Sequence, residues 1–206
     1  MTPQQLLKKY WGYTTFRPLQ AEIIQAVLAG KDVLALLPTG GGKSICFQVP
    51  ALAREGLCIV VSPLIALMKD QVDQLRQRGI AAEAVFSGMR ASAIDTALDN
   101  CIYGPVKFLY VSPERLQTTL LQERVKKMSV NLLAIDEAHC ISQWGYDFRP
   151  TYLEIAAFRA LLPPHVNAIA LTATATATVQ QDIQEKLQLQ PCAHFQKSFA
   201  RPNLTY

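Results

Sequence analysis

A glycine-rich loop between an apolar run and an apolar helical segment is the first part of the sequence that could do chemistry. The loop reads Pro38-Thr39-Gly40-Gly41-Gly42-Lys43-Ser44. Its three glycines let backbone N–H groups turn toward an anion, and the helix that follows adds its positive end. Lys43 can reach the β- and γ-phosphates of a nucleotide, and the Ser44 hydroxyl can ligate Mg²⁺. The loop therefore predicts a triphosphate site, although Leu37 stands where the general pattern has its first glycine.

A second reactive group follows the apolar run at 131–135 and consists of Asp136, Glu137 and His139. A carboxylate at the carboxyl end of a buried parallel strand faces the crevice in which ligands bind. There Asp136 would bind Mg²⁺ through water, Glu137 would deprotonate the attacking water, and His139 would contact the γ-phosphate or relay its loss. Alone, the cluster suits a solvated acidic loop equally well. Its pairing with the phosphate loop favours catalysis and predicts that Lys43 and both carboxylates meet at one triphosphate.

Short aliphatic runs that alternate with longer amphipathic segments must position these two groups. Buried strands are expected at 32–37, 57–61, 82–86, 106–111, 131–135 and 166–171. Helical patterns cover 19–28, 64–78, 92–100, 116–128, 152–161 and 176–187, in addition to the helix after the loop. This alternation predicts an α/β fold, a doubly wound and mostly parallel sheet with helices on both faces. We find no repeat or linker, so we expect one domain over residues 1–206.

Composition excludes several classes of protein. Half of the 206 residues are hydrophobic and 17% are charged, which argues against a disordered or collagen-like chain. The five cysteines are odd in number and lack a Cys-x-x-Cys pair, which predicts neither a zinc site nor a disulfide framework and favours a cytoplasmic location. No aliphatic run is long enough to cross a membrane and no signal peptide is evident, so we expect no membrane partner. The net charge of +4 is compatible with nucleic acid without indicating it.

An aromatic-rich stretch follows the acidic cluster. It reads Cys140-Ile141-Ser142-Gln143-Trp144-Gly145-Tyr146-Asp147-Phe148-Arg149-Pro150. Together with Asp136-Glu137-Ala138-His139, it resembles the aromatic-rich loop of the RecQ family of superfamily 2 helicases. Further motifs of that family occur in order: Phe16-Arg17-Pro18-Leu19-Gln20, Val61-Ser62-Pro63-Leu64-Ile65-Ala66-Leu67-Met68-Lys69-Asp70-Gln71, Tyr110-Val111-Ser112-Pro113-Glu114-Arg115 and Leu171-Thr172-Ala173-Thr174-Ala175. The resemblance covers residues 13–206, and Leu37 is usual in superfamily 2.

The first of these motifs implies that Tyr13, Arg17 and Gln20 bind adenine. The tyrosine ring can stack on the base, and the glutamine amide offers one donor and one acceptor to the N6/N7 edge. The alternative is that Phe16 and Pro18 only fix the entry into a helix, with Gln20 solvated.

The next two motifs imply contacts with the backbone phosphates of DNA. Ser62 and Ser112 each lie between the end of a strand and the start of a helix, and Lys69 and Arg115 add positive charge. Ordinary helix capping by the two serines is the alternative.

The aromatic-rich stretch and the last motif imply a link between DNA and the nucleotide site. Unpaired bases would stack on the rings of the stretch, beside an arginine. The positions concerned are Trp144, Tyr146, Phe148 and Arg149. The hydroxyls of Thr172 and Thr174 would connect the acidic cluster to the DNA side. The alternatives are a small hydrophobic cluster that anchors a loop and β-branched residues that fill a strand end.

The resemblance thus implies a RecA-like first motor lobe of a 3′-to-5′ DNA helicase that uses ATP and Mg²⁺. Its partners would be single-stranded and forked DNA and a second RecA-like lobe, which carries the arginine finger and is missing here. The zinc-binding part of the family is also missing, so we expect a fragment of a longer protein, nucleoid-associated if bacterial. Three alternatives stay open: an RNA helicase lobe, a phosphate-loop kinase of a small molecule, and a non-catalytic DNA-binding module.

Overall fold

Seven parallel strands form one sheet in the computed structural model, which describes residues 1–38, 40–189 and 191–196. The strands are β1 (Asp32–Leu36), β2 (Leu57–Val61), β3 (Ala82–Val85), β4 (Phe108–Val111), β5 (Val130–Ile135), β6 (Ala168–Thr172) and β7 (Cys192–Gln196). Their order across the sheet is β3-β4-β2-β5-β6-β1-β7. Since β6 alone separates β1 from β5, the phosphate loop and the acidic cluster emerge at neighbouring positions of the same sheet edge.

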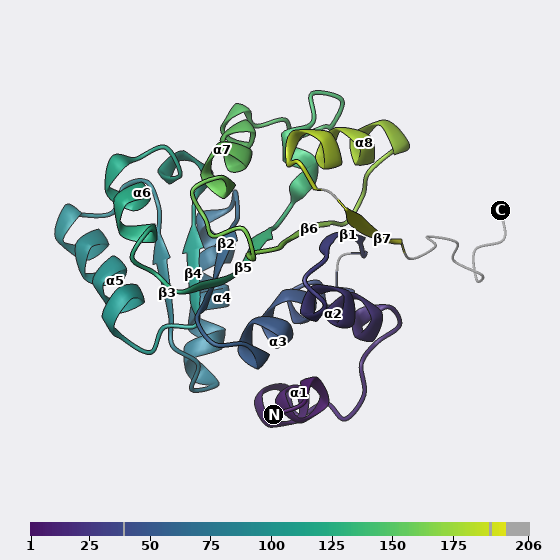
Figure 1. Cartoon of the computed structure of the whole chain (residues 1–206), viewed down its shortest axis with the longest axis horizontal. Helices are drawn as coiled ribbons and strands as arrows, with labels where there is room; N and C mark the ends of the chain where they lie inside the picture. The colour runs from purple at the N-terminus through teal and green to yellow at the C-terminus, as the bar shows by residue number, and fades with distance from the viewer. Residues whose placement is uncertain (39, 190, 197–206) are drawn as a thin grey trace, which may run out of the picture.

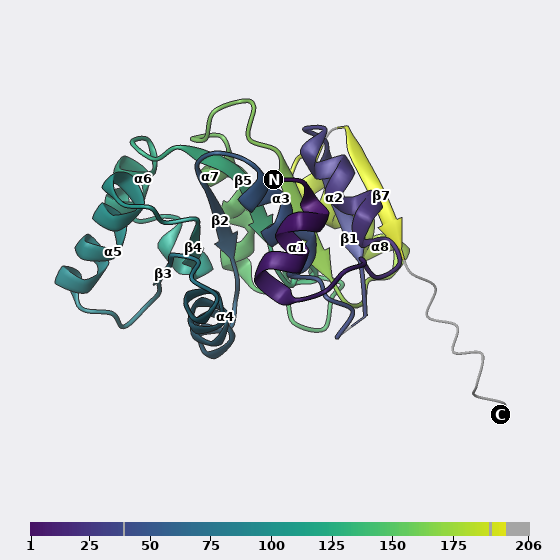
Figure 2. The ribbon, with the colours of Figure 1, turned by 90° about the horizontal axis from the view of Figure 1, so that it is seen from below.

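Helices cover both faces of the sheet. They are α1 (Pro3–Trp11), α2 (Gln20–Leu28), α3 (Ile45–Ala53), α4 (Ile65–Gln77), α5 (Ala91–Tyr103), α6 (Thr119–Val125), α7 (Ile155–Arg159) and α8 (Ala177–Lys186). Short 3₁₀ helices are η1 (Pro113–Arg115), η2 (Ala138–Ile141) and η3 (Pro150–Glu154). One hydrophobic core joins the sheet to α2, α3 and α4, and another joins its opposite face to α5–α8 (Figure 1). Helix α1 packs outside α3 (Figure 2).

The strands form where the sequence is apolar at consecutive positions. In β1, Val33 and Ala35 contact the core on the α2–α4 side, whereas Leu34 and Leu36 contact the opposite core. Both sets are fully buried, as expected for a parallel sheet that is covered on both faces. The predicted doubly wound α/β fold is therefore confirmed.

Several predicted elements differ from the observed ones. Strand β7 was not predicted. It lies at the edge of the sheet, and its residues are partly buried or exposed, so its sequence lacks a continuous apolar run. The helix expected at 116–128 is confined to α6, after η1 and a turn. The helix expected at 152–161 begins as η3 and becomes α-helical only in α7. Among the described residues, no helix combines the length and apolar character needed to cross a membrane.

A buried ion pair joins α7 to the amino edge of the sheet. Asp32 is only 5% exposed, and its two carboxylate oxygens accept hydrogen bonds from Arg159 Nη2 at 2.8 and 2.7 Å. Oδ1 also accepts the N–H of Ala168 at 2.8 Å, at the start of β6. The carboxylate therefore connects a helix and two strands through charge-assisted hydrogen bonds.

We expect Asp32→Asn to lower the free energy of unfolding by about 2 kcal/mol, because hydrogen bonds to a charged group contribute roughly 1.5–3 kcal/mol. Urea denaturation at neutral pH measures the change. Glu123→Gln is the control, since its pair with Lys126 is exposed and screened by solvent, so its loss should leave stability nearly unchanged. Equal effects of the two changes would show that the Asp32 pair does not anchor α7.

Candidate functional site

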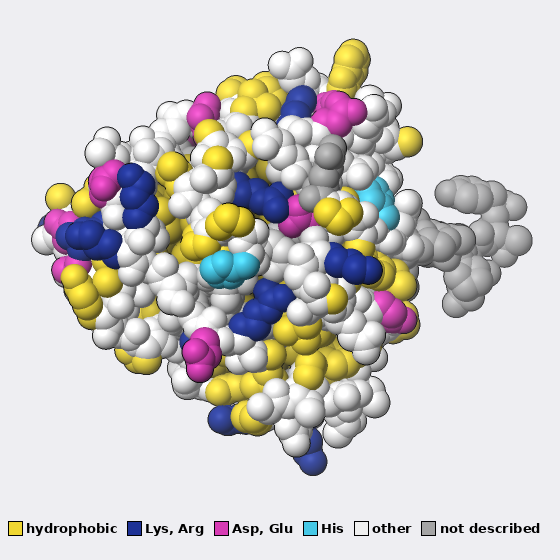
Figure 3. All heavy atoms as spheres, viewed as in Figure 1, with side chains coloured by type: hydrophobic (Ala, Val, Ile, Leu, Met, Phe, Trp, Pro, Cys, Tyr) yellow, Lys and Arg dark blue, Asp and Glu magenta, His cyan; other side chains and the backbone are white. Residues whose placement is uncertain are grey.

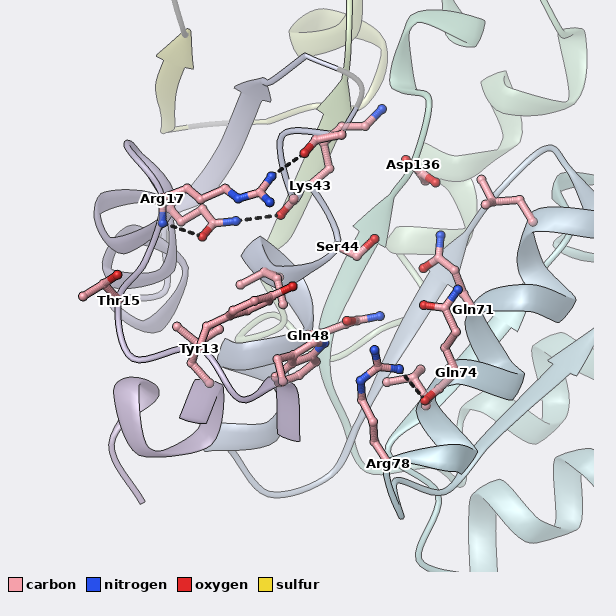
Figure 4. A pocket seen from close by; sticks show the side chains of 18 of the residues that line it. Tyr13, Thr15, Arg17, Lys43, Ser44, Gln48, Gln71, Gln74, Arg78 and Asp136 are labelled. Carbon is pink, nitrogen blue, oxygen red and sulfur yellow. Dashed lines mark hydrogen bonds between the residues drawn. The ribbon is translucent and has the colours of Figure 1, made fainter. Parts of the chain in front are cut away.

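A cavity of about 630 Å³ lies at the carboxyl edge of the sheet (Figure 4). Its walls come from four separate parts of the chain: residues 7–20, the phosphate loop with the start of α3, helix α4 with Arg78 after it, and the end of β5. The lining includes Tyr13, Arg17, Gln20, Gly40, Gly42, Lys43, Ser44, Asp136 and Glu137. The structure thus brings together the adenine motif, the phosphate loop and the acidic cluster that the sequence analysis considered separately. Of the predicted nucleotide contacts, Thr39 lies outside the described residues.

The loop lysine and an acidic side chain form an ion pair inside this cavity. Lys43 Nζ lies 2.8 Å from Glu137 Oε1, and the two side chains are 14% and 23% exposed. Asp136 is buried beside them. Burial raises the pKa of the Asp136 carboxyl, and the nearby Lys43 ammonium acts in the opposite direction. Lys43 and both carboxylates therefore surround one space, as the sequence analysis expected.

The backbone at Glu137 adopts an uncommon conformation. Its φ and ψ are both 46°, in the left-handed region, which costs a residue other than glycine roughly 1–2 kcal/mol. Surrounding contacts must supply the compensation, and one is a hydrogen bond of 2.8 Å from the Tyr152 hydroxyl to the Asp136 carbonyl. Tyr152 is fully buried. The sequence analysis did not assign this tyrosine to the site, because nothing local relates residue 152 to residue 136.

The phosphate loop is hydrogen-bonded to the segment around the start of α2. The Arg17 guanidinium donates to the Gly40 carbonyl, and Gln20 Nε2 donates to the Gly42 carbonyl at 3.0 Å. Gln20 Oε1 accepts the N–H of Arg17 at 2.9 Å. Gln20 is therefore buried and engaged, so the alternative of a solvated glutamine is wrong. Its amide retains one N–H and one lone pair for a ligand.

The glycines of the loop allow its tight path. A Cβ atom at Gly41 would lie 2.7 Å from the Pro38 carbonyl oxygen, and Gly42 has a φ of +78°. A larger residue at either position would therefore strain the loop.

His139 connects the acidic cluster to the end of β6. The imidazole is 4% exposed, and its Nδ1 lies 2.9 Å from Thr172 Oγ1 and 3.3 Å from Glu137 Oε2. The Thr172 hydroxyl donates its only hydrogen to the Thr174 carbonyl at 3.1 Å. Its oxygen must therefore accept from His139, which assigns the imidazole proton to Nδ1. Burial lowers the pKa of His139, while Glu137 acts in the opposite direction. The predicted coupling residues Thr172 and Thr174 therefore belong to one hydrogen-bonded chain with His139. Thr174 takes part through its backbone carbonyl and not through the hydroxyl.

The aromatic-rich loop, residues 142–149, projects its rings outward. Trp144 is 76% exposed and Tyr146 is 81% exposed, whereas Phe148 is half-buried. A buried hydrophobic cluster, the alternative for this stretch, is therefore wrong for the first two rings. Tyr146 stacks on His139 with the ring centroids 4.9 Å apart and an interplanar angle of 23°. The sequence analysis did not foresee this stack, which joins the loop to the acidic cluster.

The base of the loop is tied to the rest of the molecule by hydrogen bonds. Ser142 Oγ donates to Asp182 Oδ2 at 2.6 Å. The Arg149 guanidinium donates to the Pro63 carbonyl at 3.1 Å, just after β2. The loop is thereby joined to α8 on one side and to a predicted DNA segment on the other.

The two serines predicted to contact DNA lie beneath the surface. Ser62 and Ser112 are buried, and neither hydroxyl has a hydrogen-bond partner among the described residues. Their N–H groups donate within the sheet, to Val111 and Val85. Serine capping is therefore wrong as an explanation for either residue. Direct phosphate contact stays a prediction and requires these segments to shift.

The two basic residues predicted beside them converge on Phe86. Lys69 Nζ lies 4.9 Å from the centre of the Phe86 ring, and the Arg115 guanidinium donates to the Phe86 carbonyl at 3.2 Å. Both cations thus lie near the carboxyl ends of β3 and β4, apart from the nucleotide cavity.

Comparisons with known proteins agree with this arrangement. The DEAD/DEAH box helicase family matches residues 17–183. A protein from Pasteurella multocida named ATP-dependent DNA helicase RecQ is 46% identical over 205 residues, which is 100% of this chain and 32% of that protein. A Bacillus subtilis protein of the same name is 46% identical over 98% of this chain and 34% of its own length. The chain spans about a third of the length of these curated relatives.

A solved structure supports the fold independently. A hypothetical ATP-dependent RNA helicase from Sulfolobus tokodaii superposes with a TM-score of 0.70 over 95% of this chain and 56% of that one, at 18% sequence identity. The family match and the whole-chain similarity to RecQ proteins together identify the relationship: the chain belongs to the DEAD/DEAH box helicase family.

Proposed function

We propose that this chain is the first motor lobe of a RecQ-like DNA helicase, which hydrolyses ATP with Mg²⁺ and moves 3′ to 5′ along single-stranded DNA. One observation carries the proposal. Lys43, Asp136 and Glu137 surround a single cavity, and His139 connects them to a loop of exposed aromatic rings.

The cavity has the chemistry to bind ATP. Tyr13 is 56% exposed and lines the cavity, so its ring is free to stack on a base. The remaining amide N–H and lone pair of Gln20 suit the donor and acceptor edge of adenine. Backbone N–H groups of the glycine loop and the Lys43 ammonium would bind the phosphates.

The residues present also fit Mg²⁺. This cation prefers oxygen ligands and keeps several waters, and the cavity offers the Ser44 hydroxyl and the Asp136 carboxylate. Burial raises the pKa of the Asp136 carboxyl, so a cation bound beside it would stabilise the charged form. When bound, Mg²⁺ would neutralise charge on the β- and γ-phosphates.

Glu137 is our candidate for the general base. It now pairs with Lys43, so phosphates that attract the lysine would release the carboxylate to orient and deprotonate water. The Nδ1–H of His139 lies 3.3 Å from the second oxygen of Glu137, where it can fix the orientation of that carboxylate. An arginine from a second lobe would stabilise the charge that develops during phosphoryl transfer.

The aromatic-rich loop is our candidate for sensing DNA. Exposed rings give stacking platforms for unpaired bases, with Arg149 next to them. On the face shown in Figure 3, basic and acidic side chains are interspersed. The proposed recognition by stacking depends on the exposed rings of Trp144 and Tyr146. A base that displaced Tyr146 from His139 would act directly on the partner of Glu137.

We further propose that residues 1–206 form one domain and that the second RecA-like lobe lies elsewhere in the protein. The chain alone would then bind nucleotide weakly, hydrolyse it slowly and unwind nothing. A cytoplasmic, nucleoid-associated location and forked DNA substrates belong to the same proposal.

Binding of a fluorescent single-stranded DNA tests the proposed loop. We expect Trp144→Ala to weaken binding roughly 5- to 150-fold, because one stacked base contributes about 1–3 kcal/mol. Tyr103→Ala is the matched control: Tyr103 is 80% exposed but ends α5, remote from the loop, and its loss should leave binding unchanged.

The alternatives predict different results in assays of nucleic-acid binding, nucleotide binding and ATP hydrolysis. Equal binding of RNA, with equal stimulation of ATP hydrolysis, would favour an RNA helicase lobe. Phosphate transfer to a metabolite instead of water would favour a kinase. DNA binding without any nucleotide binding would favour a non-catalytic module.

A further inference from the structure

Three side chains with metal-binding atoms meet beneath the aromatic-rich loop. They are His139, Cys140 and Asp147, and one potential ligand atom from each lies within 4.8 Å of the other two. Cys140 Sγ lies 3.6 Å from Asp147 Oδ2 and 3.9 Å from His139 Nε2. His139 and Cys140 are buried, and Asp147 is half-buried, which leaves one side open to solvent.

These separations are close to those of a tetrahedral zinc site. Bond lengths of about 2.3 Å to sulfur and about 2.0–2.1 Å to nitrogen or oxygen place neighbouring ligand atoms roughly 3.6 Å apart. The sulfur–oxygen distance already has this value, and the sulfur–nitrogen distance exceeds it by a few tenths of an ångström. The nitrogen and the carboxylate oxygen lie within 4.8 Å of each other, so the Asp147 side chain would rotate toward the imidazole to complete the site.

The imidazole is already oriented for a metal. Its Nδ1–H is bonded to Thr172 Oγ1, so the free lone pair belongs to Nε2, the nitrogen on the Cys140 side. Histidine ligands in metal sites commonly have this second hydrogen bond, which fixes their tautomer and ring direction. The Tyr146 ring stacked on the imidazole further restricts its rotation.

We propose that His139 Nε2, Cys140 Sγ and the Asp147 carboxylate bind a divalent transition metal ion of the Zn²⁺ type, with water in the fourth position. On binding, the thiol releases its proton to solvent and a sulfur–metal bond forms. Asp147 Oδ2 lies 3.3 Å from the Arg149 guanidinium. On metal binding, the carboxylate would leave this contact and bind the metal instead. A set of one sulfur, one nitrogen and one carboxylate favours zinc over the oxygen-seeking Mg²⁺.

Such an ion would tie the aromatic-rich loop to η2. Asp147 belongs to the loop, whereas His139 and Cys140 belong to η2 beside the acidic cluster. The metal would therefore hold the loop in the position where Tyr146 covers His139. The absence of a Cys-x-x-Cys pair predicted no zinc site, but a site with a single cysteine leaves no such pattern in the sequence. This inference does not depend on nucleotide binding.

Titration of the 206-residue chain with Co²⁺, a spectroscopic substitute for Zn²⁺, tests the site. We expect one ion per chain, a near-ultraviolet band from thiolate-to-cobalt charge transfer, visible bands of tetrahedral Co²⁺, and loss of all bands when Zn²⁺ is added. Cys140→Ser should abolish the charge-transfer band and weaken binding on the order of 100-fold. Cys192→Ser, which changes a partly buried thiol in β7, should leave the titration unchanged.

Asp147→Asn provides a second test on the solvent side, where the fold is least sensitive. We expect this variant to weaken Co²⁺ binding roughly tenfold or more while keeping the charge-transfer band at saturation. Circular dichroism verifies that each variant is folded. The proposal is overturned if the chain gives no charge-transfer band at micromolar Co²⁺, if Cys140→Ser keeps that band, or if Asp147→Asn binds as the unchanged chain does.

Discussion

Replacing Glu137 by glutamine is expected to reduce ATP hydrolysis roughly 10²- to 10⁴-fold, the usual contribution of a positioned general base, while nucleotide binding stays at least as tight. The amide keeps the shape of the carboxylate but cannot accept a proton from water. The change also removes the ion pair that engages Lys43 at 2.8 Å without nucleotide, so the lysine becomes freer to meet phosphate. Hydrolysis of radiolabelled ATP and binding of a fluorescent ATP analogue measure the two effects separately.

Glu185→Gln is the matched control, because Glu185 is exposed on α8 and lies outside the cavity. It should change neither quantity. Near-normal hydrolysis by Glu137→Gln would exclude this residue as the base. Loss of nucleotide binding together with hydrolysis would instead indicate that the carboxylate maintains the cavity, given the strained backbone at this position.

The parts of the site that the sequence predicts are those with a local cause. The glycines and Lys43 follow a buried strand directly, and chain geometry alone puts them at the carboxyl end of β1. Asp136 and Glu137 have the same relation to β5. Because parallel strands present all their carboxyl ends at one edge, the meeting of the loop with the acidic residues follows from the fold class.

The parts that could not be predicted depend on contacts between distant residues. The Tyr152 hydroxyl bond to the Asp136 carbonyl and the burial of Ser62 and Ser112 arise only when the chain has folded. The stack of Tyr146 on His139 depends on the path of the loop, which no periodicity encodes. The edge strand β7 has a weak pattern because its outer side needs no apolar cover.

Two contacts of Glu137 suggest how ATP and DNA would act on the same carboxylate if the proposed function holds. One oxygen pairs with Lys43, the residue that phosphate would attract. The other oxygen lies near His139, whose ring carries Tyr146 of the aromatic-rich loop. In the proposed function, nucleotide would act on one side of the Glu137 carboxylate and the aromatic-rich loop on the other, so full activity would require both ligands.

Replacing Lys43 by alanine should weaken nucleotide binding and also slow ATP hydrolysis, the two quantities that Glu137→Gln separates. A charge-assisted hydrogen bond to phosphate contributes about 1.5–3 kcal/mol, so nucleotide affinity should fall roughly 10- to 100-fold. Turnover in a protein that joins this lobe to its second lobe should fall roughly 10²- to 10³-fold, the effect of losing one preorganised electrostatic contact. The same binding and hydrolysis assays measure both losses.

Lys43→Arg should not restore activity, since a planar fork cannot replace a compact ammonium in the space beside Glu137. The double variant with Glu137→Gln should be about as inactive as the worse single variant, because residues that act as a unit are not additive. If Lys43→Ala hydrolysed ATP at a near-normal rate, the phosphate assignment would be wrong. The 2.8 Å pair with Glu137 would then be a structural contact, and removing it should lower stability rather than activity.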